Sequence, residues 1–495
     1  MIDMWWSVGL SVIAGLAVVS LTHYWYRWSN PKCNGKLPPG SMGFPLIGET
    51  IQFFIGGSMY SVDIPPFIKK RIARYGTLFR TSLVGRPVVM SSDPEFNHFI
   101  LQKEDKLIEL WYMDAFSAII GTVANATSTA HILKYLKNLF LNHFGIERLK
   151  ENQMMNKMEV MAHQYLQSWS TQPSVQVKES IASMVFDLTS LQLLTYDSNK
   201  YSSSKDMSKM LANFLDGVMS LPLNIPGTVF HRCMKDREKL LNMIKEIINE
   251  KITSPEKRLG DFLDQLLNDR EKEEGVMKEC LTEEFLVSLM FGLLLASVET
   301  ISLTLNVVMM LLSDHPLVLK ELMEEHEEIL KSRENVDSPI TWKEYKSMTF
   351  TTKVINETLR VSSVAPGILR KAIKDIHVNG YVIPKGWTIM VLHSAIHKNP
   401  ANFEDPLAFN PWRWKDLGSN TQAKNFFPFG GGIRHCVGAE FAKVFMSLFL
   451  HVLVTKFSWT KMKGGGDATG ILAVSPRNDF HVKICQKNDI KAHSS

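Results

Sequence analysis

The pattern of apolar and polar residues predicts a chain built mainly from helices. Residues 285–313 form a long apolar run whose only charged residue is Glu299, and as a helix this run would extend about 44 Å. Residues 439–450 are apolar at helical spacing, and from about residue 94 to residue 249 one helical pattern follows another. A mainly α architecture is therefore expected.

Strand-like alternation is confined to short segments. Residues 77–79 and 84–91 alternate near the N-terminus, and residues 381–386 and 388–392 do so in the last third of the chain. Residues 464–474 suggest a further hairpin. The predicted fold class is thus mainly α with small β-sheets.

The N-terminal segment is typical of a membrane anchor. Residues 4–26 contain no Asp, Glu, Lys or Arg, and about twenty apolar residues in a helix cross a bilayer. A cleaved signal peptide is the alternative, but Asp3 stands where such peptides are basic. Basic residues follow between 27 and 36, so the positive-inside rule places the rest of the chain in the cytosol.

These patterns predict three parts. Residues 1–28 form the anchor, residues 29–50 form a hinge stiffened by prolines and turned by glycines, and residues 51–495 form a single large domain. An apolar loop, residues 221–227, is bounded by helix breakers and is compatible with packing in the core.

Composition and residue spacing argue against several classes of function. The formal net charge of +5 is small for 495 residues, and no basic run with interleaved aromatic residues indicates nucleic-acid binding. The five cysteines show no CxxC spacing, which argues against a zinc site or a disulfide framework. The acidic run 324–328 contains His326 but no second His four residues on, so we expect a solvated helix face there.

Candidate chemistry centres on Cys436. The glycines of residues 430–432 precede it and Gly438 follows it, just before the helix predicted over residues 439–450. Amide groups and the dipole at a helix start stabilise a thiolate, and a soft anionic sulfur suits a transition metal. An isolated cysteine is more often a small buried hydrophobe. The residues around Cys436 must therefore decide between a metal ligand and a core residue.

The residues Phe429, Gly432, Arg434, Cys436 and Gly438 resemble the heme-binding signature of the cytochromes P-450, the heme-thiolate monooxygenases. The resemblance implies the P-450 fold with an N-terminal transmembrane anchor, and it implies that the apolar loop at residues 221–227 contacts the membrane in place of packing in the core. It also implies that Cys436 is the axial iron ligand, that Phe429 packs beside the sulfur, and that Arg434 reaches a heme propionate.

Further site residues follow only from this resemblance. Arg370 matches a frequent propionate contact. Lys137 is the best match to another, four residues after Leu133, and its alternative is a solvated helix face. The residues expected to line the substrate pocket are Ala296, Val364, Ala365, Ile368, Leu369, Ile471 and Leu472.

The segment from Ala296 to Thr300 resembles the oxygen-activation motif of the same family, with Ser297 where Gly is usual. Hydropathy alone would make its helix a second transmembrane span, but a carboxylate facing lipid is costly, so Glu299 indicates a buried site. The resemblance implies that Glu299 and Thr300 lie over the iron and deliver protons to dioxygen. For Thr300 the alternative is a hydroxyl bonded to its own helix.

Glu357 and Arg360 stand three residues apart on one face of a helix predicted over residues 342–361. In isolation they would form a surface salt bridge with little effect. The resemblance implies instead that they interlock with Arg413 and support the proximal side of the heme as structural residues.

Within the family the chain resembles the plant branch that oxidises sterols and triterpenoids, including cucurbitane triterpene hydroxylases and sterol side-chain-cleaving enzymes. This implies heme b, dioxygen as co-substrate, and NADPH through a separate membrane-bound reductase. The implied location is the endoplasmic reticulum membrane, with a single pass and a cytosolic catalytic domain.

The expected reaction is hydroxylation and cleavage of a sterol side chain to a pregnane such as pregnenolone. The alternatives are hydroxylation of a triterpenoid ring or methyl group and, from another class, a heme protein without monooxygenase activity.

Overall fold

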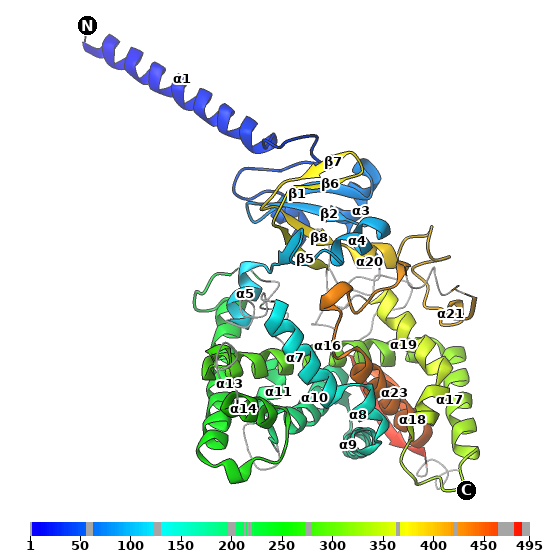
Figure 1. The fold of residues 1–495 in the computed structure, drawn as a ribbon. Helices are drawn as coiled ribbons and strands as arrows, with labels where there is room; N and C mark the ends of the chain where they lie inside the picture. The colour runs from blue at the N-terminus through cyan, green and yellow to red at the C-terminus, as the bar shows by residue number, and fades with distance from the viewer. Residues whose placement is uncertain are drawn as a thin grey trace. The chain divides into compact units, whose positions relative to one another are not determined.

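The structure is a computed structural model of the chain (Figure 1). It describes residues 2–55, 63–121, 130–196, 204–211, 214, 217, 220, 222–272, 279–362, 367–416, 418, 424–463 and 480–487. The chain divides into two compact units, one of residues 1–59, 64–111 and 365–396 and the other of residues 60–63, 112–364 and 397–495. The division into an anchor, a hinge and one catalytic domain stays a prediction.

The first unit is built around a five-stranded sheet in the order β1-β2-β8-β5-β3, in which β2 and β8 are parallel and the other pairs antiparallel. Its elements are α1 (Ile2–Ser29), α2 (Thr50–Ile55), α3 (Pro66–Tyr75), β1 (Leu78–Leu83), β2 (Arg86–Ser91), α4 (Pro94–Leu101), β3 (Ile108–Leu110), β5 (Ile368–Ala372), β6 (Ile376–Val378), β7 (Tyr381–Ile383) and β8 (Thr388–Val391). All four residues of the central strand β8 are buried, which explains its continuous apolar character.

The second unit is mainly helical, with a three-stranded sheet in the order β4-β10-β9. Its elements are α5 (Asp114–Ile120), α7 (Ala130–Phe144), α8 (Ile146–Lys150), α9 (Gln153–Ser170), β4 (Val175–Gln176), α10 (Val177–Leu194), α11 (Ser204–Leu211), α13 (Val229–Thr253), η2 (Pro255–Lys257), α14 (Phe262–Lys272), α16 (Glu283–Asp314), α17 (Pro316–Lys331), α18 (Trp342–Ser347), α19 (Thr349–Val361), α21 (Arg413–Asp416), η3 (Gly432–Arg434), α23 (Ala439–Lys456), β9 (Phe457–Lys463) and β10 (His481–Gln486). The short helix α20 (His393–His397) contains the boundary between the units.

The long helix α16 is the centre of this unit, where α10, α13, α19 and α23 pack against it (Figure 1). Its first turn is capped by the Thr282 hydroxyl, which accepts from the backbone N–H of Phe285, and carries two acidic residues that suit the helix dipole. Two stretches of the described chain, Glu283–Asp314 and Gly432–Lys456, are long and apolar enough to cross a bilayer, but each is 72% buried in its most apolar window. Such burial is typical of core helices.

The prediction of one helix over residues 342–361 was wrong, because the structure contains two helices that meet at Met348. The carboxylate of Glu325 on α17 accepts hydrogen bonds from the backbone N–H groups of Phe350 (2.5 Å) and Thr351 (2.9 Å). These amides belong to the first turn of α19 and have no partner within it. Glu325 of α17 therefore caps the first turn of α19, whose beginning has no capping residue in the local sequence.

The acidic run on α17 is only partly solvated. Glu324, Glu327 and Glu328 are exposed, but His326 is fully buried. Its Nδ1 lies 3.0 Å from Nδ1 of His451 on α23, and its Nε2 lies 3.0 Å from the Thr351 hydroxyl. The expected solvated face is thus corrected at His326, which joins three helices in the core.

Burial lowers the pKa of His326 to about 3 and that of His451 to about 4. Both rings are neutral in the folded protein. As the pH falls below about 6.5, the two histidines of the unfolded chain bind protons while those of the folded chain do not, and this favours unfolding. Each histidine should therefore remove about 2 kcal/mol of unfolding free energy between pH 7 and pH 5. The variant His326→Asn should lose one of these two contributions in chemical denaturation at both pH values, whereas exposed His98→Asn should follow the wild type. Equal pH dependence in all three proteins would contradict this assignment.

Candidate functional site

The loop before α23 holds Cys436 in a tight turn. The backbones of Gly430 (φ 75°) and Gly432 (φ 68°) adopt the left-handed conformation, which strains any residue with a side chain. The Cys436 N–H donates to the Phe429 carbonyl at 2.9 Å, and the His435 N–H donates to the Gly432 carbonyl at 3.1 Å. The glycine spacing seen in the sequence is therefore what folds this loop back on itself.

Cys436 is the only one of the five cysteines that is an exposed residue, and the other four are half-buried or buried. Surrounding atoms nevertheless raise its pKa by desolvation, and a hydrogen bond from the Gly438 backbone opposes this to a smaller extent. The expectation that the helix start alone stabilises a thiolate is thus corrected, because burial outweighs it. A bound metal ion would reverse the balance, since a coordinating thiol is deprotonated outright.

The surroundings of Cys436 fit a metal that brings its own equatorial ligands. Within the described ranges no group of three or more His, Cys, Asp or Glu side chains could hold a free ion. A Cβ at Gly438 would lie 4.0 Å from both the Cys436 sulfur and the Phe140 ring. A single soft sulfur ligand on a glycine-rich loop suits an iron porphyrin.

Positive charge gathers beside this loop. Lys137 on α7 and Lys443 on α23, after desolvation, help to lower the pKa of His435. The Lys443 ammonium also lies 5.3 Å from the centre of the Phe429 ring, and Arg434 is half-buried in η3. Lys137 therefore lies close enough to the signature loop to interact with His435, although its predicted contact with a propionate stays a prediction.

The α16 motif presents two accessible residues one turn apart. Ala296 and Thr300 are exposed, and Thr300 Oγ1 donates to the Ala296 carbonyl at 2.6 Å. Ser297 likewise bonds the carbonyls of Leu293 (2.9 Å) and Leu294 (3.0 Å). The structure thus shows the alternative arrangement for Thr300, a hydroxyl bonded to its own helix, on a face that remains open.

Glu299 points elsewhere. Its side chain is only 2% exposed, and its Oε1 lies 3.4 Å from Nζ of Lys178 on α10, which is itself 7% exposed. The Glu299 side chain therefore lies on the buried side of α16 and Thr300 on its accessible side, and the placement of both over the iron stays a prediction. Sequence reasoning missed Lys178; the available signal was that a buried carboxylate needs a buried cation, but nothing along the chain identified which one.

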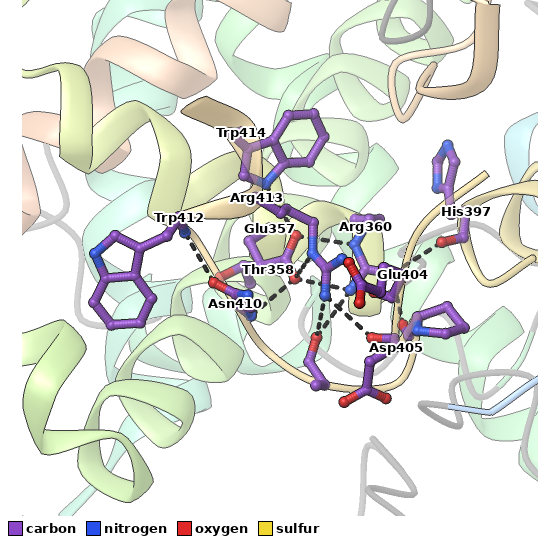
Figure 2. A network of polar contacts seen from close by, with 12 residues as sticks. Glu357, Thr358, Arg360, His397, Glu404, Asp405, Asn410, Trp412, Arg413 and Trp414 are labelled. Atoms are coloured by element: carbon purple, nitrogen blue, oxygen red, sulfur yellow. Dashed lines mark hydrogen bonds and ion pairs between the residues drawn. The ribbon is translucent and has the colours of Figure 1, made fainter. Parts of the chain in front are cut away.

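The structure brings Glu357, Arg360 and Arg413 together (Figure 2). The Glu357 carboxylate accepts from Arg360 Nε at 2.9 Å and Nη2 at 2.8 Å, and from Arg413 Nε at 2.9 Å. It also accepts from the Trp414 indole and the Asn410 backbone N–H, each at 2.9 Å. These last two donors were missed, although both belong to the segment that supplies Arg413.

This network continues towards the cysteine loop. Arg360 Nη1 donates to the carbonyls of His397 (2.9 Å) and Pro406 (2.6 Å). The ring Nε2 of His397 accepts from the Phe427 backbone N–H at 3.2 Å, which is an ordinary polar contact. The buried charges of α19 are thus connected to the segment that leads to Cys436.

Arg370 lies on β5 in the first unit. Its Nε donates to Glu104 Oε2 at 2.8 Å, both side chains are buried, and its Nη1 donates to the Leu369 carbonyl. Ile368 and Leu369 are half-buried. The other predicted pocket residues, Val364, Ala365, Ile471 and Leu472, lie outside the described residues.

Sequence comparison places this site in a known family. The family model described as "Cytochrome P450" matches residues 38–471. The cucurbitadienol 11-hydroxylase of Siraitia grosvenorii is 45% identical over 96% of this chain and 99% of its own. The beta-amyrin 16-alpha-hydroxylase CYP87D16 of Maesa lanceolata is 44% identical over 98% and 100%, and the cholesterol 16,22-dihydroxylase CYP90G4 of Trigonella foenum-graecum is 33% identical over 90% and 92%.

Structural comparison agrees. The retinoic acid bound cyanobacterial CYP120A1 superposes with a TM-score of 0.77 and 26% identity, covering 92% of this chain and all of that one. The expected fold and enzyme class are confirmed, with heme, dioxygen and NADPH-derived electrons from a reductase as the family's requirements. This protein is a heme-thiolate monooxygenase of the cytochrome P450 family.

Proposed function

We propose that this monooxygenase hydroxylates a rigid apolar polycycle of the triterpenoid or sterol class, with a triterpenoid skeleton as the first candidate. The observation that carries the proposal is the similarity along almost the whole chain to two triterpenoid hydroxylases, at 45% and 44% identity. The similarity is not restricted to the heme signature and extends over almost all of the chain in which the proposed pocket residues lie.

In this proposal Cys436 holds the iron, and Arg434 and Lys137 supply positive charge for the propionates. Arg370, which is paired with Glu104, is retained as a further proposed propionate contact. The heme, when bound, supplies the activation of dioxygen, and thiolate donation from Cys436 favours O–O cleavage. The chain itself orients the substrate and keeps stray water from the reacting carbon.

On the α16 face, the small Ala296 side chain leaves room for an apolar substrate and the Thr300 hydroxyl remains accessible. The Thr300 hydroxyl already donates its hydrogen bond to the Ala296 carbonyl. Its oxygen can therefore accept a hydrogen bond from a donor that enters the site. The Glu299 side chain lies on the buried side of the helix, where it is paired with Lys178.

Oxidation of a sterol side chain, ending in cleavage, is the second candidate. The cholesterol 16,22-dihydroxylase at 33% identity supports a sterol as substrate and its hydroxylation, whereas cleavage is carried only by the family resemblance of the sequence. Side-chain cleavage was the first expectation drawn from the family resemblance, whereas the more similar relatives support skeletal hydroxylation.

The test is turnover with a plant reductase, NADPH and separate samples of cucurbitadienol, β-amyrin and cholesterol, followed by mass spectrometry. A product one oxygen atom heavier, with the skeleton intact, is expected from a triterpenoid. A steroid shortened in its side chain would establish the second candidate instead, and the absence of any NADPH-dependent product from all three would contradict the proposed substrate class.

We also propose that α1 anchors the protein in the endoplasmic reticulum membrane with the catalytic part in the cytosol, where the reductase meets it. From Val12 to Tyr26 the apolar side chains of α1 are exposed, and Arg27 lies in its last turn. In the loop after residue 221, Leu223 and Ile225 are also exposed. This disfavours core packing for that loop and supports the expected membrane contact.

A further inference from the structure

Three helices of the second unit meet around the guanidinium of Arg237. Arg237 lies on α13, and its Nε donates to the backbone carbonyl of Ile119, in the last turn of α5, at 2.5 Å. Both α5 and α13 pack against α16 (Figure 1). The positive charge of Arg237 therefore lies at the negative end of the α5 dipole.

Gly121 makes room for this guanidinium. A Cβ at Gly121 would lie 2.7 Å from Arg237 Nη2, which is too close for a side chain, and 3.8 Å from Oγ of Ser288 on α16. The backbone of Gly121 has φ 74°, a conformation that glycine adopts without strain. Nη2 thus reaches past the end of α5 towards α16, where Ser288 is buried.

The guanidinium has more donors than the protein uses. Arg237 carries five N–H donors, and the bond to Ile119 uses the one on Nε. Within the residues that the structure describes, neither Nη1 nor Nη2 has an acceptor, and no carboxylate pairs with Arg237. Burial lowers the pKa of Arg237, so these surroundings do not offset the desolvation of its charge. An acceptor on a ligand would supply that compensation.

The surface of α16 stays open from this point towards Thr300. Small residues follow each other at intervals of four, at positions 288, 292, 296 and 300, which places them in one continuous row along a helix. In the described chain a Cβ at Gly292 would meet no atom within 4 Å, and Ala296 and Thr300 are exposed. The row extends about 18 Å, so a long rigid molecule can lie along it with one end at Arg237.

We propose that Arg237 determines specificity by donating hydrogen bonds to an oxygen atom on the terminal ring of the substrate. The inference rests on the proposed function and deepens it, because it requires that the polycycle carry a hydroxyl or ketone oxygen at one end. A guanidinium donates and does not accept, so both kinds of oxygen suit it. The carbons remote from this oxygen then lie nearer to Thr300.

A purely structural role for Arg237, the capping of α5, uses different atoms. The cap uses Nε, and Nε2 of a Gln side chain lies the same number of bonds from the backbone. Gln has no counterpart of the two Nη donor groups. The variant Arg237→Gln therefore keeps a donor for the Ile119 carbonyl and removes the groups that we assign to substrate recognition.

The test measures dissociation constants by titrating the full-length holoprotein with ligand and following the heme absorbance. The ligands are β-amyrin, cucurbitadienol and cholesterol, each as the 3-hydroxy compound, the 3-ketone and the 3-deoxy compound. Arg232→Gln is the matched control, since Arg232 is exposed on the same helix. The carbon monoxide spectrum verifies that each variant retains its heme.

The wild type and Arg232→Gln should bind the hydroxy and keto forms about tenfold more tightly than the deoxy form, as one hydrogen bond to a charged group provides. Arg237→Gln should reduce this preference to about twofold or less, by weaker binding of the oxygenated forms. The wild-type comparison does not depend on the folding of any variant.

Equal binding of the three forms by the wild type would overturn the inference and leave the proposed substrate class intact. A preference that Arg237→Gln leaves unchanged would overturn it as well, because the oxygen would then be recognised elsewhere. If the wild type binds none of the three skeletons, the proposed substrate class fails and the role of Arg237 fails with it.

Discussion

Replacing Glu357 by Gln is expected to cost about 3–5 kcal/mol of unfolding free energy, a large part of the roughly 5–15 kcal/mol available to a folded domain. The Glu357 carboxylate is fully buried and accepts five hydrogen bonds, from Arg360, Arg413, Trp414 and Asn410 (Figure 2). The Gln amide lacks the negative charge that balances the guanidinium groups of Arg360 and Arg413. Its NH2 group would also face the N–H donors that now bond to the carboxylate. Denaturant midpoints and thermal unfolding would measure the loss.

The matched control is Glu328→Gln on α17, since Glu328 is exposed and lies in the same unit. Its change should stay within about 0.5 kcal/mol. The conservative variant Glu357→Asp keeps the charge and should recover part of the stability. An effect of Glu357→Gln no larger than that of the control would contradict the structural role assigned to this network.

The second large effect is expected at the buried pair of Lys178 and Glu299. The variant Lys178→Met leaves the Glu299 carboxylate buried without that cation, which should cost about 3–5 kcal/mol. The double variant with Glu299→Gln removes both charges and should recover part of the loss. A double-mutant cycle of unfolding free energies should therefore show a coupling of about 1–3 kcal/mol.

The exposed pair of Lys320 and Glu324, separated by 3.7 Å on α17, provides the control cycle and should couple by less than about 1 kcal/mol. If Lys178→Met and Glu299→Gln act additively, the ion pair does not form in solution. In that case Glu299 would be free to turn towards the Thr300 side of α16, as the family resemblance had suggested.

Local spacing was sufficient to predict the parts of the site that lie close together in the sequence. The glycines around Cys436, the helix start at Ala439 and the pair of Glu357 and Arg360 are each determined within a few residues. The motif containing Arg413 added the third member of the network. These contacts could be predicted because neighbouring residues and a recognised motif determine them.

Contacts between distant segments could not be predicted in this way. Lys178 lies 121 residues before its partner, and the start of α19 depends on Glu325 of α17, so the sequence around Met348 gives no sign of a break. The burial of His326 also depends on α23. In each case the decisive partner comes from another helix.

Two opposing effects act on the pKa of Cys436, and sequence reasoning considered only one of them. The Gly438 backbone favours the thiolate, as expected before a helix, but desolvation raises the pKa by a larger amount. These surroundings therefore disfavour the anion, and ligation to a bound metal would provide the compensating interaction.

The most direct test of the account is the absorbance of the purified full-length protein, reduced in the presence of carbon monoxide. The wild type and Cys485→Ser should both give the spectrum of a thiolate-ligated heme, since Cys485 lies on β10 and has no predicted part in the site. Cys436→Ser should abolish that spectrum. A wild type without the thiolate spectrum, or a Cys436→Ser variant that keeps it, would contradict the assignment of Cys436 as the iron ligand.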